Sequence, residues 1–436
     1  MNILLATHNF LPYHIGGTEI YVLNLAKFLT QKGHNITIIA AIDSDSANEN
    51  NTVYEDSNIK IFSYLYDDLS VFGVKYKQIE TEQIYAKHSD AHTNSYRLFF
   101  EDKHFDIVHV NGFTAIIGLD LIFSLKYKIP KIKIISAYHT AISDPKETLT
   151  FANKFKEQPE KIDYVADGLS YRFDLPYWFT KRITPFLLTK RIPFLPAIFN
   201  IKHYTKLHLD AFQQLIGITD EWWVYSSGIQ DILSTQVKSS MIKFQRHGIS
   251  PIFLSKKNFS KGSHKFIFSG RLLKIKGFHT LLKAWGELEE NNLKELWITA
   301  DSNVDDYIIK NLLKKTSHRK DIKFLGTLPQ EQLSNTYAQA HTVIIPSECY
   351  EIGPLVFHEA IACGCNVIAS DFGGCRELVA YYKGSTTSFR TGNVQDLKNK
   401  ICQQLSLTKR PTQNKPIAFN MHFEMIIKQS GIYIHD

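Results

Sequence analysis

The chain has 436 residues, and its 50 lysines and arginines against 43 aspartates and glutamates give a formal net charge of +7. Hydrophobic residues make up 44% of it, which is enough for large packed cores and excludes disorder over most of the chain. No stretch reaches the roughly 18 uninterrupted apolar residues of a membrane-spanning helix. The first residues lack a basic region followed by an apolar run, so we expect no signal peptide and a cytoplasmic protein.

The first forty residues have the pattern of a β-α-β unit. Residues 3–7 form an apolar run, and after Gly16 and Gly17 the apolar residues repeat at helical spacing as far as Gly33. Residues 36–40 then predict a second buried strand, which implies a parallel sheet. Further strands of the first domain are expected at 59–64, 107–110, 132–136 and 222–226.

A second strand–helix series begins near residue 265. Its strands are expected at 265–269, 296–300, 322–325, 343–346 and 366–370, and a helix at 278–288. Two such series predict the α/β class with two doubly wound domains. We place the first domain at 1–245, with an aromatic and basic insertion at about 140–215, and the second at 246–418. Residues 419–436 are expected to form a helix that returns to the first domain.

The five cysteines predict reduced thiols. Their number is odd, and Cys349, Cys363, Cys365 and Cys375 lie close together without the spacing of a known zinc site. We interpret them as small core residues and expect no metal site.

In the segment 347–360, the glutamates Glu351 and Glu359 flank an expected helix start. A strand is expected to end just before it, and Pro354 is favoured at the first helical position. Ligands of open α/β sheets bind beyond the carboxyl ends of the strands, where the N–H groups of a helix start can hold a phosphate. Glu351 in the loop and Glu359 on the helix could accept hydrogen bonds from sugar hydroxyls. The alternative is that both are ordinary surface glutamates at a helix start.

The segment 270–277 follows the first strand of the second domain, and two of its cations, Arg271 and Lys276, are candidate ligands of a phosphate. Arg271 suits forked contacts to phosphate oxygens, and Lys276 offers a point charge. Together they could stabilise a departing diphosphate. An ordinary basic surface turn is the alternative.

These motifs occur in a characteristic order. Gly16 and Gly17 follow the first strand, Gly-Arg-x4-Lys-Gly occupies 270–277, and Glu-x7-Glu occupies 351–359. In this order they resemble a GT-B retaining glycosyltransferase of glycosyltransferase family 4, also described as glycosyl transferases group 1. The resemblance covers nearly the whole chain and implies two Rossmann-like domains that face an interdomain cleft.

The resemblance implies roles for single residues. Glu359 matches the glutamate that binds the ribose hydroxyls of the sugar nucleotide, and Glu351 the one that contacts the donor sugar. Arg271 and Lys276 match the pair that holds the donor diphosphate. Main chain at Ile352, Gly353, Pro354 and Leu355 would complete this part of the substrate site.

Three other places match less specific positions of the family. Main chain at Gly16 and Gly17 matches backbone that approaches the donor phosphates or the acceptor. His139 matches a histidine near the donor sugar, and its alternative is a core or turn histidine. Gly326 sits where main chain borders the nucleotide base. The sequence departs from the family at 301–303, where Asp-Ser-Asn replaces a Gly-x-Gly turn, and at 351–354.

By resemblance, the reaction transfers a hexose-type sugar from a UDP- or GDP-linked donor to a hydroxyl of a glycan or lipid-linked acceptor. The anomeric configuration would be retained, with no metal or other cofactor. Expected pathways are surface polysaccharide, lipopolysaccharide or glycolipid synthesis. Two alternatives stay open: a nucleotide-sugar epimerase of the same fold, and a catalytically silent protein that binds sugar nucleotides. A dinucleotide dehydrogenase is disfavoured, because no Gly-x-Gly-x-x-Gly follows a strand.

Residues 176–208 hold six of the seven excess positive charges and no acidic residue. Aromatic residues alternate with these lysines and arginines, which is typical of a surface that contacts anionic lipid headgroups. We therefore expect a peripheral protein at the inner face of the membrane and no nucleic-acid partner. The alternative is a structural insertion with its charges in water.

Overall fold

The computed structural model describes residues 1–42, 51–77, 88–113, 117–137, 175–187, 201–254, 264–290, 294–300, 306–405 and 414–433, with isolated positions at 150–151, 154–155, 162, 166, 169 and 304. The chain divides into two compact units. The first unit comprises 1–145, 181–245 and 423–436, and the second comprises 146–180 and 246–422.

In the described part of the first unit, nine strands form one sheet in the order β11-β10-β7-β6-β1-β2-β5-β4-β3. The pairs from β11 to β5 are parallel, and β4 and β3 continue the sheet as antiparallel strands. The strands are β1 (Asn2–Thr7), β2 (Asn35–Ala41), β3 (Thr52–Glu55), β4 (Ile59–Tyr66), β5 (Leu69–Tyr76), β6 (Ile107–Asn111), β7 (Lys133–Ala137), β10 (Glu221–Val224) and β11 (Ile242–Phe244).

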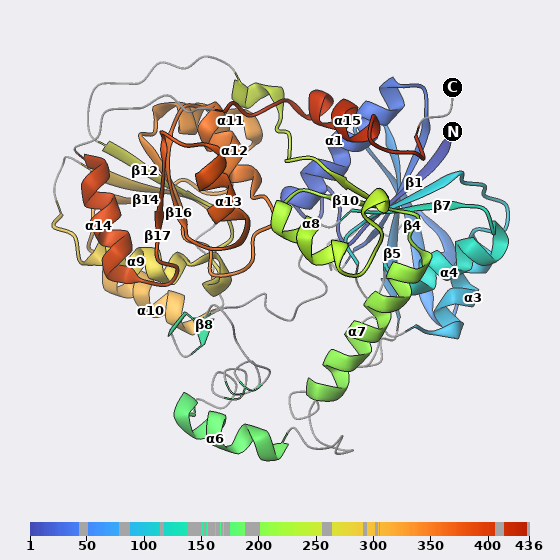
Figure 1. The fold of residues 1–436 in the computed structure, drawn as a ribbon, viewed down its shortest axis with the longest axis horizontal. Coiled ribbons are helices and arrows are strands. Elements are labelled where there is room, and N and C mark those ends of the chain that lie inside the picture. Colours follow the sequence, from blue (N-terminus) through green and yellow to red (C-terminus); the bar gives the residue numbers. More distant parts are fainter. Residues whose placement is uncertain are drawn as a thin grey trace. The chain divides into compact units, whose positions relative to one another are not determined.

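Helices connect the parallel strands of this first sheet, as the β-α-β pattern predicts. They are α1 (Gly17–Gln31), α3 (Asp90–Phe99), α4 (Leu119–Lys128), α7 (Ile201–Ile218) and α8 (Ser227–Ser234) (Figure 1). Helix α6 (Tyr177–Leu187) belongs to the second unit up to Thr180 and to the first unit from Lys181.

In the described part of the second unit, six parallel strands form a sheet in the order β14-β13-β12-β15-β16-β17. Its strands are β12 (His264–Ser269), β13 (Lys294–Thr299), β14 (Ile322–Phe324), β15 (Thr342–Ile345), β16 (Asn366–Ser370) and β17 (Thr386–Phe389). Its helices are α9 (Phe278–Gly286), α10 (Tyr307–Thr316), α11 (Gln330–Gln339), α12 (Leu355–Ala362), α13 (Gly373–Tyr381) and α14 (Val394–Leu405). A small hairpin, β8 (Thr150–Phe151) with β9 (Lys154–Phe155), also groups with this unit.

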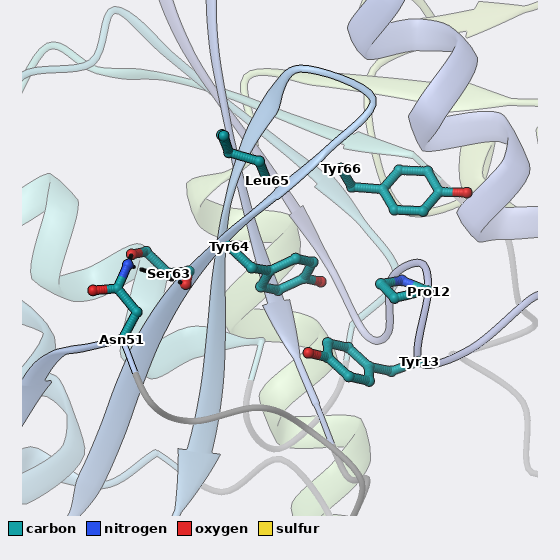
Figure 2. A pocket seen from close by; sticks show the side chains of 7 residues that line it. All are labelled: Pro12, Tyr13, Asn51, Ser63, Tyr64, Leu65 and Tyr66. Carbon is teal, nitrogen blue, oxygen red and sulfur yellow. Dashed lines mark hydrogen bonds between the residues drawn. The ribbon is translucent and has the colours of Figure 1, made fainter.

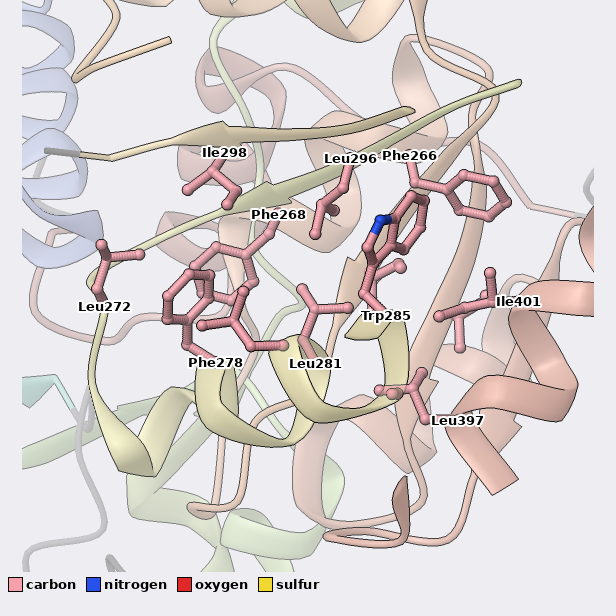
Figure 3. Close-up of a cluster of buried hydrophobic side chains, with 14 of the residues drawn as sticks. Phe266, Phe268, Leu272, Phe278, Leu281, Trp285, Leu296, Ile298, Leu397 and Ile401 are labelled. Atoms are coloured by element: carbon pink, nitrogen blue, oxygen red, sulfur yellow. The ribbon is translucent and has the colours of Figure 1, made fainter. Parts of the chain in front are cut away.

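The second sheet is buried on both faces. Phe266 and Phe268 of β12 point into a cluster with Trp285 of α9 and Leu397 of α14 (Figure 3). Ile267, between the two phenylalanines, belongs to the opposite cluster, which also contains residues of α11, α12 and α13. This alternation is typical of a parallel strand covered by helices on each side. The mainly parallel first sheet and the parallel second sheet confirm the predicted α/β class with two Rossmann-like domains.

The end of the chain packs in the first unit. Helix α15 (Phe419–Ile427) begins in the second unit, and its Phe423 ring lies 5.3 Å from the Tyr21 ring of α1, measured between centroids. Farther on, the Tyr433 hydroxyl lies 3.3 Å from Nδ1 of His109 on β6. Among the described helices, none combines the length and hydropathy that crossing a lipid bilayer requires.

The sequence pattern misses six of the described strands: β3, β5, β8, β9, β11 and β17. Residues 52–55 form the edge strand β3, whose side chains are mostly exposed and therefore show no apolar pattern. Strand β5 contains Gly73, which lies against the Phe62 ring of β4 and interrupts the apolar run. Strand β17 is short and rich in threonine.

Candidate functional site

The strand order of the second sheet reverses between β12 and β15. From β12 the chain adds β13 and β14 on one side, then crosses to add β15, β16 and β17 on the other. The carboxyl ends of β12 and β15 are neighbours, because the two strands pair in parallel at Phe266 with Thr342 and at Ile267 with Val343. Such a switch point is the usual ligand site of an open α/β sheet. The loops at 270–277 and 346–354 both begin there.

An ion pair joins these two loops. Nζ of Lys276 lies 2.6 Å from Oε1 of Glu351, and the Ser347 hydroxyl donates a hydrogen bond to the same oxygen at 2.7 Å. Burial alone would lower the pKa of Lys276, but the charge of Glu351 outweighs it and raises that pKa. Burial likewise opposes ionisation of Glu351, yet Lys276 and Ser347 lower its pKa below the ordinary value. Both groups are therefore charged near neutral pH.

The fully buried carboxylate of Glu348 lies in the same loop as Glu351 and links this loop to the start of α9. Glu348 accepts a hydrogen bond from the Thr280 hydroxyl, and Nε2 of His279 lies 3.6 Å from its Oε1. Burial lowers the pKa of His279 to about 3, so this imidazole is neutral. The backbone N–H of Glu348 also donates to the carbonyl of Ile275 at 2.8 Å. These contacts fasten the start of α9 and the turn that carries Lys276 to the loop that carries Glu351.

Glycines allow the backbones to come this close. Gly277 has φ +67°, and a Cβ there would lie 1.8 Å from the carbonyl oxygen of Pro346. On the other side of the loop, the N–H of Gly374 donates to the Glu351 carbonyl at 2.6 Å, and a Cβ on Gly374 would lie 2.4 Å from that oxygen. No other residue type fits either contact without displacing backbone.

Glu359 is a buried acid on α12. Its residue is 7% exposed, and burial raises the pKa of its carboxyl to about 8. Burial is the cause of this shift, and no hydrogen bond from a described residue lowers the pKa of the carboxyl. A buried polar group without a partner costs free energy, which a ligand can recover by donating hydrogen bonds to it.

Helix α12 begins at Leu355, with Pro354 at its N-cap. No side chain caps this end, so the first N–H groups of the helix are free of side-chain acceptors. Ile352 and Gly353 lead into the helix from the Lys276–Glu351 pair. An uncapped helix start next to a lysine favours an anion.

Arg271 follows β12 and is exposed. It lies near enough to oppose the charge of Lys276, and no carboxylate in the described part of the chain pairs with it. The second unit thus gathers two cations, a helix start and two glutamates at one edge of its sheet.

The remaining predicted site residues lie elsewhere. Gly326 follows β14 with φ +72°, and a Cβ there would have nothing within 4 Å. Gly16 and Gly17 begin α1 in the first unit, where a Cβ on Gly16 would lie 2.6 Å from Oε2 of Glu19. His139 lies outside the described residues.

The structure adds residues to which the sequence analysis gave no role. Thr280 and His279 contact Glu348 and so hold the loop that carries Glu351, and neither residue belongs to a local sequence motif. Among the described residues, no three His, Cys, Asp or Glu side chains are grouped as metal ligands.

Two family models match the chain. Residues 251–420 match the model described as Glycosyl transferases group 1, and residues 15–184 match the model described as Glycosyltransferase Family 4. The first match contains the switch-point loops, and the second contains the loop after β1 from residue 15 onward.

The chain is also similar to known proteins, to some in sequence and to others in structure. An uncharacterized glycosyltransferase of Methanocaldococcus jannaschii is 32% identical over 115 residues, which span 26% of this chain and 29% of that protein. An uncharacterized 42.6 kDa protein in the cps region of Klebsiella pneumoniae is 23% identical over 386 residues, 87% of each protein. The crystal structure of Anabaena HepE in complex with UDP and glucose has a TM-score of 0.59 at 14% identity, covering 98% of this chain and 95% of that one. At this identity the structural likeness shows the fold.

The contact between Gly277 and Pro346 can be tested by a matched pair of variants. Gly277→Ala adds both a left-handed alanine and a clash with backbone, whereas Gly326→Ala adds only the left-handed alanine. We expect Gly326→Ala to lower the free energy of unfolding by about 1–2 kcal/mol and Gly277→Ala to lower it by clearly more. Urea unfolding measures both, and equal losses would contradict the described contact.

Proposed function

We propose that this chain, a glycosyltransferase of the GT-B fold similar to family 4, transfers a hexose from a nucleotide diphosphate sugar to an acceptor hydroxyl with retention of configuration. The observation that carries the proposal is that Lys276, with Arg271 near it, pairs with Glu351 in the loop that leads into α12, at the switch point of the second sheet. Breaking the bond between sugar and diphosphate leaves negative charge on the leaving group, and groups of positive charge held in place lower that barrier.

In this proposal the two cations bind the diphosphate. Arg271 is exposed without a carboxylate partner in the described residues, so a phosphate would be its first counter-charge. Lys276 is already fixed by Glu351, which reduces the conformational entropy lost when a ligand binds. The first N–H groups of α12 at Leu355 add a third source of positive potential. With this charge supplied by the protein, we propose that the reaction needs no metal.

Glu351 and Glu359 would then orient the rest of the donor. Glu351 lies in the same loop as the helix start, where it can meet hydroxyls of the donor sugar through its second oxygen. Glu359 is the buried acceptor that the ribose hydroxyls would satisfy. We propose main chain at Gly326, at the end of β14, as the border of the base, and main chain at Gly16 and Gly17 as the contribution of the first unit.

The donor and pathway are proposed from the similar proteins. HepE is described with UDP and glucose, so we propose a UDP-linked hexose rather than a GDP-linked one. The Klebsiella relative is described from a cps region, which supports surface polysaccharide synthesis as the pathway and a glycan or lipid-linked glycan as the acceptor. The family matches do not favour an epimerase or a silent binding protein.

Arg271→Ala tests the role of the cations in the reaction. Because Arg271 is exposed and unpaired, we expect an unchanged melting temperature, but turnover lower by on the order of 100-fold, the usual effect of removing one group that stabilises a developing charge. Lys314→Ala, on the exposed end of α10, is the matched control and should leave turnover unchanged. The assay follows UDP release with an acceptor pool, since an epimerase would convert donor without acceptor. Normal turnover in Arg271→Ala would contradict the proposed role.

We also propose that helix α6 contacts an anionic membrane surface. Its described face exposes Trp178 at 69% and Phe186 at 84%, with Arg182 exposed between them. Aromatic rings beside a cation suit the interface between headgroups and acyl chains. Lys190, Arg191 and the side chains of Lys202 and Lys206 lie outside the described residues.

Vesicle binding tests this second proposal. Trp178→Ala combined with Arg182→Glu should weaken binding to vesicles that contain phosphatidylglycerol by roughly tenfold, since each juxtamembrane cation contributes about 1 kcal/mol. Lys314→Glu combined with Lys315→Glu reverses charge on α10 and should change binding little. Equal binding by the two double variants would favour a purely structural insertion.

A further inference from the structure

The first unit contains a pocket of about 350 Å³ between the loop after β1 and strand β4. Figure 2 shows Tyr13 and Pro12 of the loop facing Tyr64 and Tyr66 of β4. Asn51, Ser63 and Leu65 complete the lining. The volume is at the small end of the range of about 300–1,000 Å³ found for small-molecule sites. It suits one or two sugar rings.

The aromatic walls of this pocket are held in place by the protein. The Tyr64 hydroxyl donates a hydrogen bond to the carbonyl of Leu11 at 3.1 Å, and the Tyr13 ring meets the Tyr64 ring edge to face at 5.3 Å between centroids. Tyr66 packs in the same manner on the buried Phe10, at 6.0 Å. The loop after β1 therefore contacts β4 at both Tyr64 and Tyr66.

The polar groups of the pocket carry no formal charge. The Asn51 side-chain amide donates to the Ser63 hydroxyl, and the backbone N–H of Ser63 donates to the Asn51 carbonyl at 2.9 Å. The Asn51 amide oxygen accepts no hydrogen bond within the described residues. The lining as a whole offers phenols, a hydroxyl and an amide, with no lysine, arginine, aspartate, glutamate or histidine.

Aromatic faces beside neutral amide and hydroxyl groups match the chemistry of an uncharged sugar. The C–H groups of a pyranose pack on tyrosine rings, and its hydroxyls exchange hydrogen bonds with amides and hydroxyls. A phosphate or carboxylate would find no counter-charge here, and a long acyl chain would leave the Asn51 and Ser63 groups without partners.

We propose that this pocket binds a neutral saccharide unit of the acceptor glycan. The assignment to the acceptor rests on the proposed function, because the donor groups gather in the second unit. The same loop continues four residues past Pro12 to Gly16, the N-cap of α1, so one loop carries both the tyrosine pocket and the predicted main-chain contact of the first unit. The proposal thus specifies an uncharged sugar at this position of the acceptor.

Saccharide binding by the full chain tests the proposal without any need for turnover. The probes are maltotriose, cellotriose and lactose, with triglucuronate as an anionic trisaccharide, observed by saturation-transfer NMR and calorimetry. We expect at least one neutral saccharide to bind with millimolar affinity, and Tyr66→Ala to weaken it about tenfold, the equivalent of about 1.4 kcal/mol. Tyr307→Ala, a similarly sized change on exposed α10, should leave it unchanged.

A second variant and a second ligand keep the result interpretable. Asn51 is exposed, so Asn51→Ala should fold normally and still weaken the saccharide severalfold. Titration with UDP should be the same in wild type, Tyr66→Ala and Asn51→Ala, and a missing UDP response in wild type would count against the proposed function and not against the pocket. Failure of every neutral saccharide to bind, tighter binding of triglucuronate, or wild-type affinity in both pocket variants would overturn the proposal.

Discussion

The approach of Gly277 to the carbonyl of Pro346 is the constraint on which the candidate site depends. It joins the ends of two neighbouring parallel strands so tightly that a single methyl group would not fit. With the loops in contact, Lys276 reaches Glu351 across them, and Glu348 can be buried beneath with Thr280 and His279 as its partners. Without that approach, the lysine and the two glutamates would belong to separate surface turns.

Some groups of this site have partners within the protein, and others would gain a partner only from a ligand. Glu351 and Lys276 satisfy each other, which fixes the lysine, whereas Arg271 and the start of α12 have no anionic partner in the described residues. Burial keeps Glu359 largely neutral, with a pKa of about 8, and no hydrogen bond from a described residue lowers that pKa. A molecule that brings both an anion and hydroxyl donors would relieve both deficits, and a nucleotide diphosphate sugar carries both.

The sequence predicts the layered α/β architecture well, because strands such as residues 266–268 are apolar on both faces and helices such as α1 show a clear period. It also singles out Arg271, Lys276, Glu351 and Glu359, since each belongs to a short local motif, and their roles toward a substrate stay predictions. What it cannot reveal are contacts between distant positions: Thr280 and Glu348 are 68 residues apart. The tyrosine pocket was missed for the same reason, because Tyr13 and Tyr64 meet only after β4 joins the sheet through strand β5, whose Gly73 hides its pattern.

The central claim is that Glu359 accepts hydrogen bonds from the ribose of a bound nucleotide. Its raised pKa makes this testable by calorimetric titration of UDP at one pH unit below and one above its value of about 8. Because ribose hydroxyls bind the ionised carboxylate best, the affinity of the wild type should rise with pH by up to about tenfold. Glu359→Gln should bind UDP at least tenfold more weakly at the higher pH and without this rise, while Glu331→Gln, on the exposed start of α11, should behave as wild type. UDP affinity in Glu359→Gln equal to that of the wild type at both pH values would contradict the account.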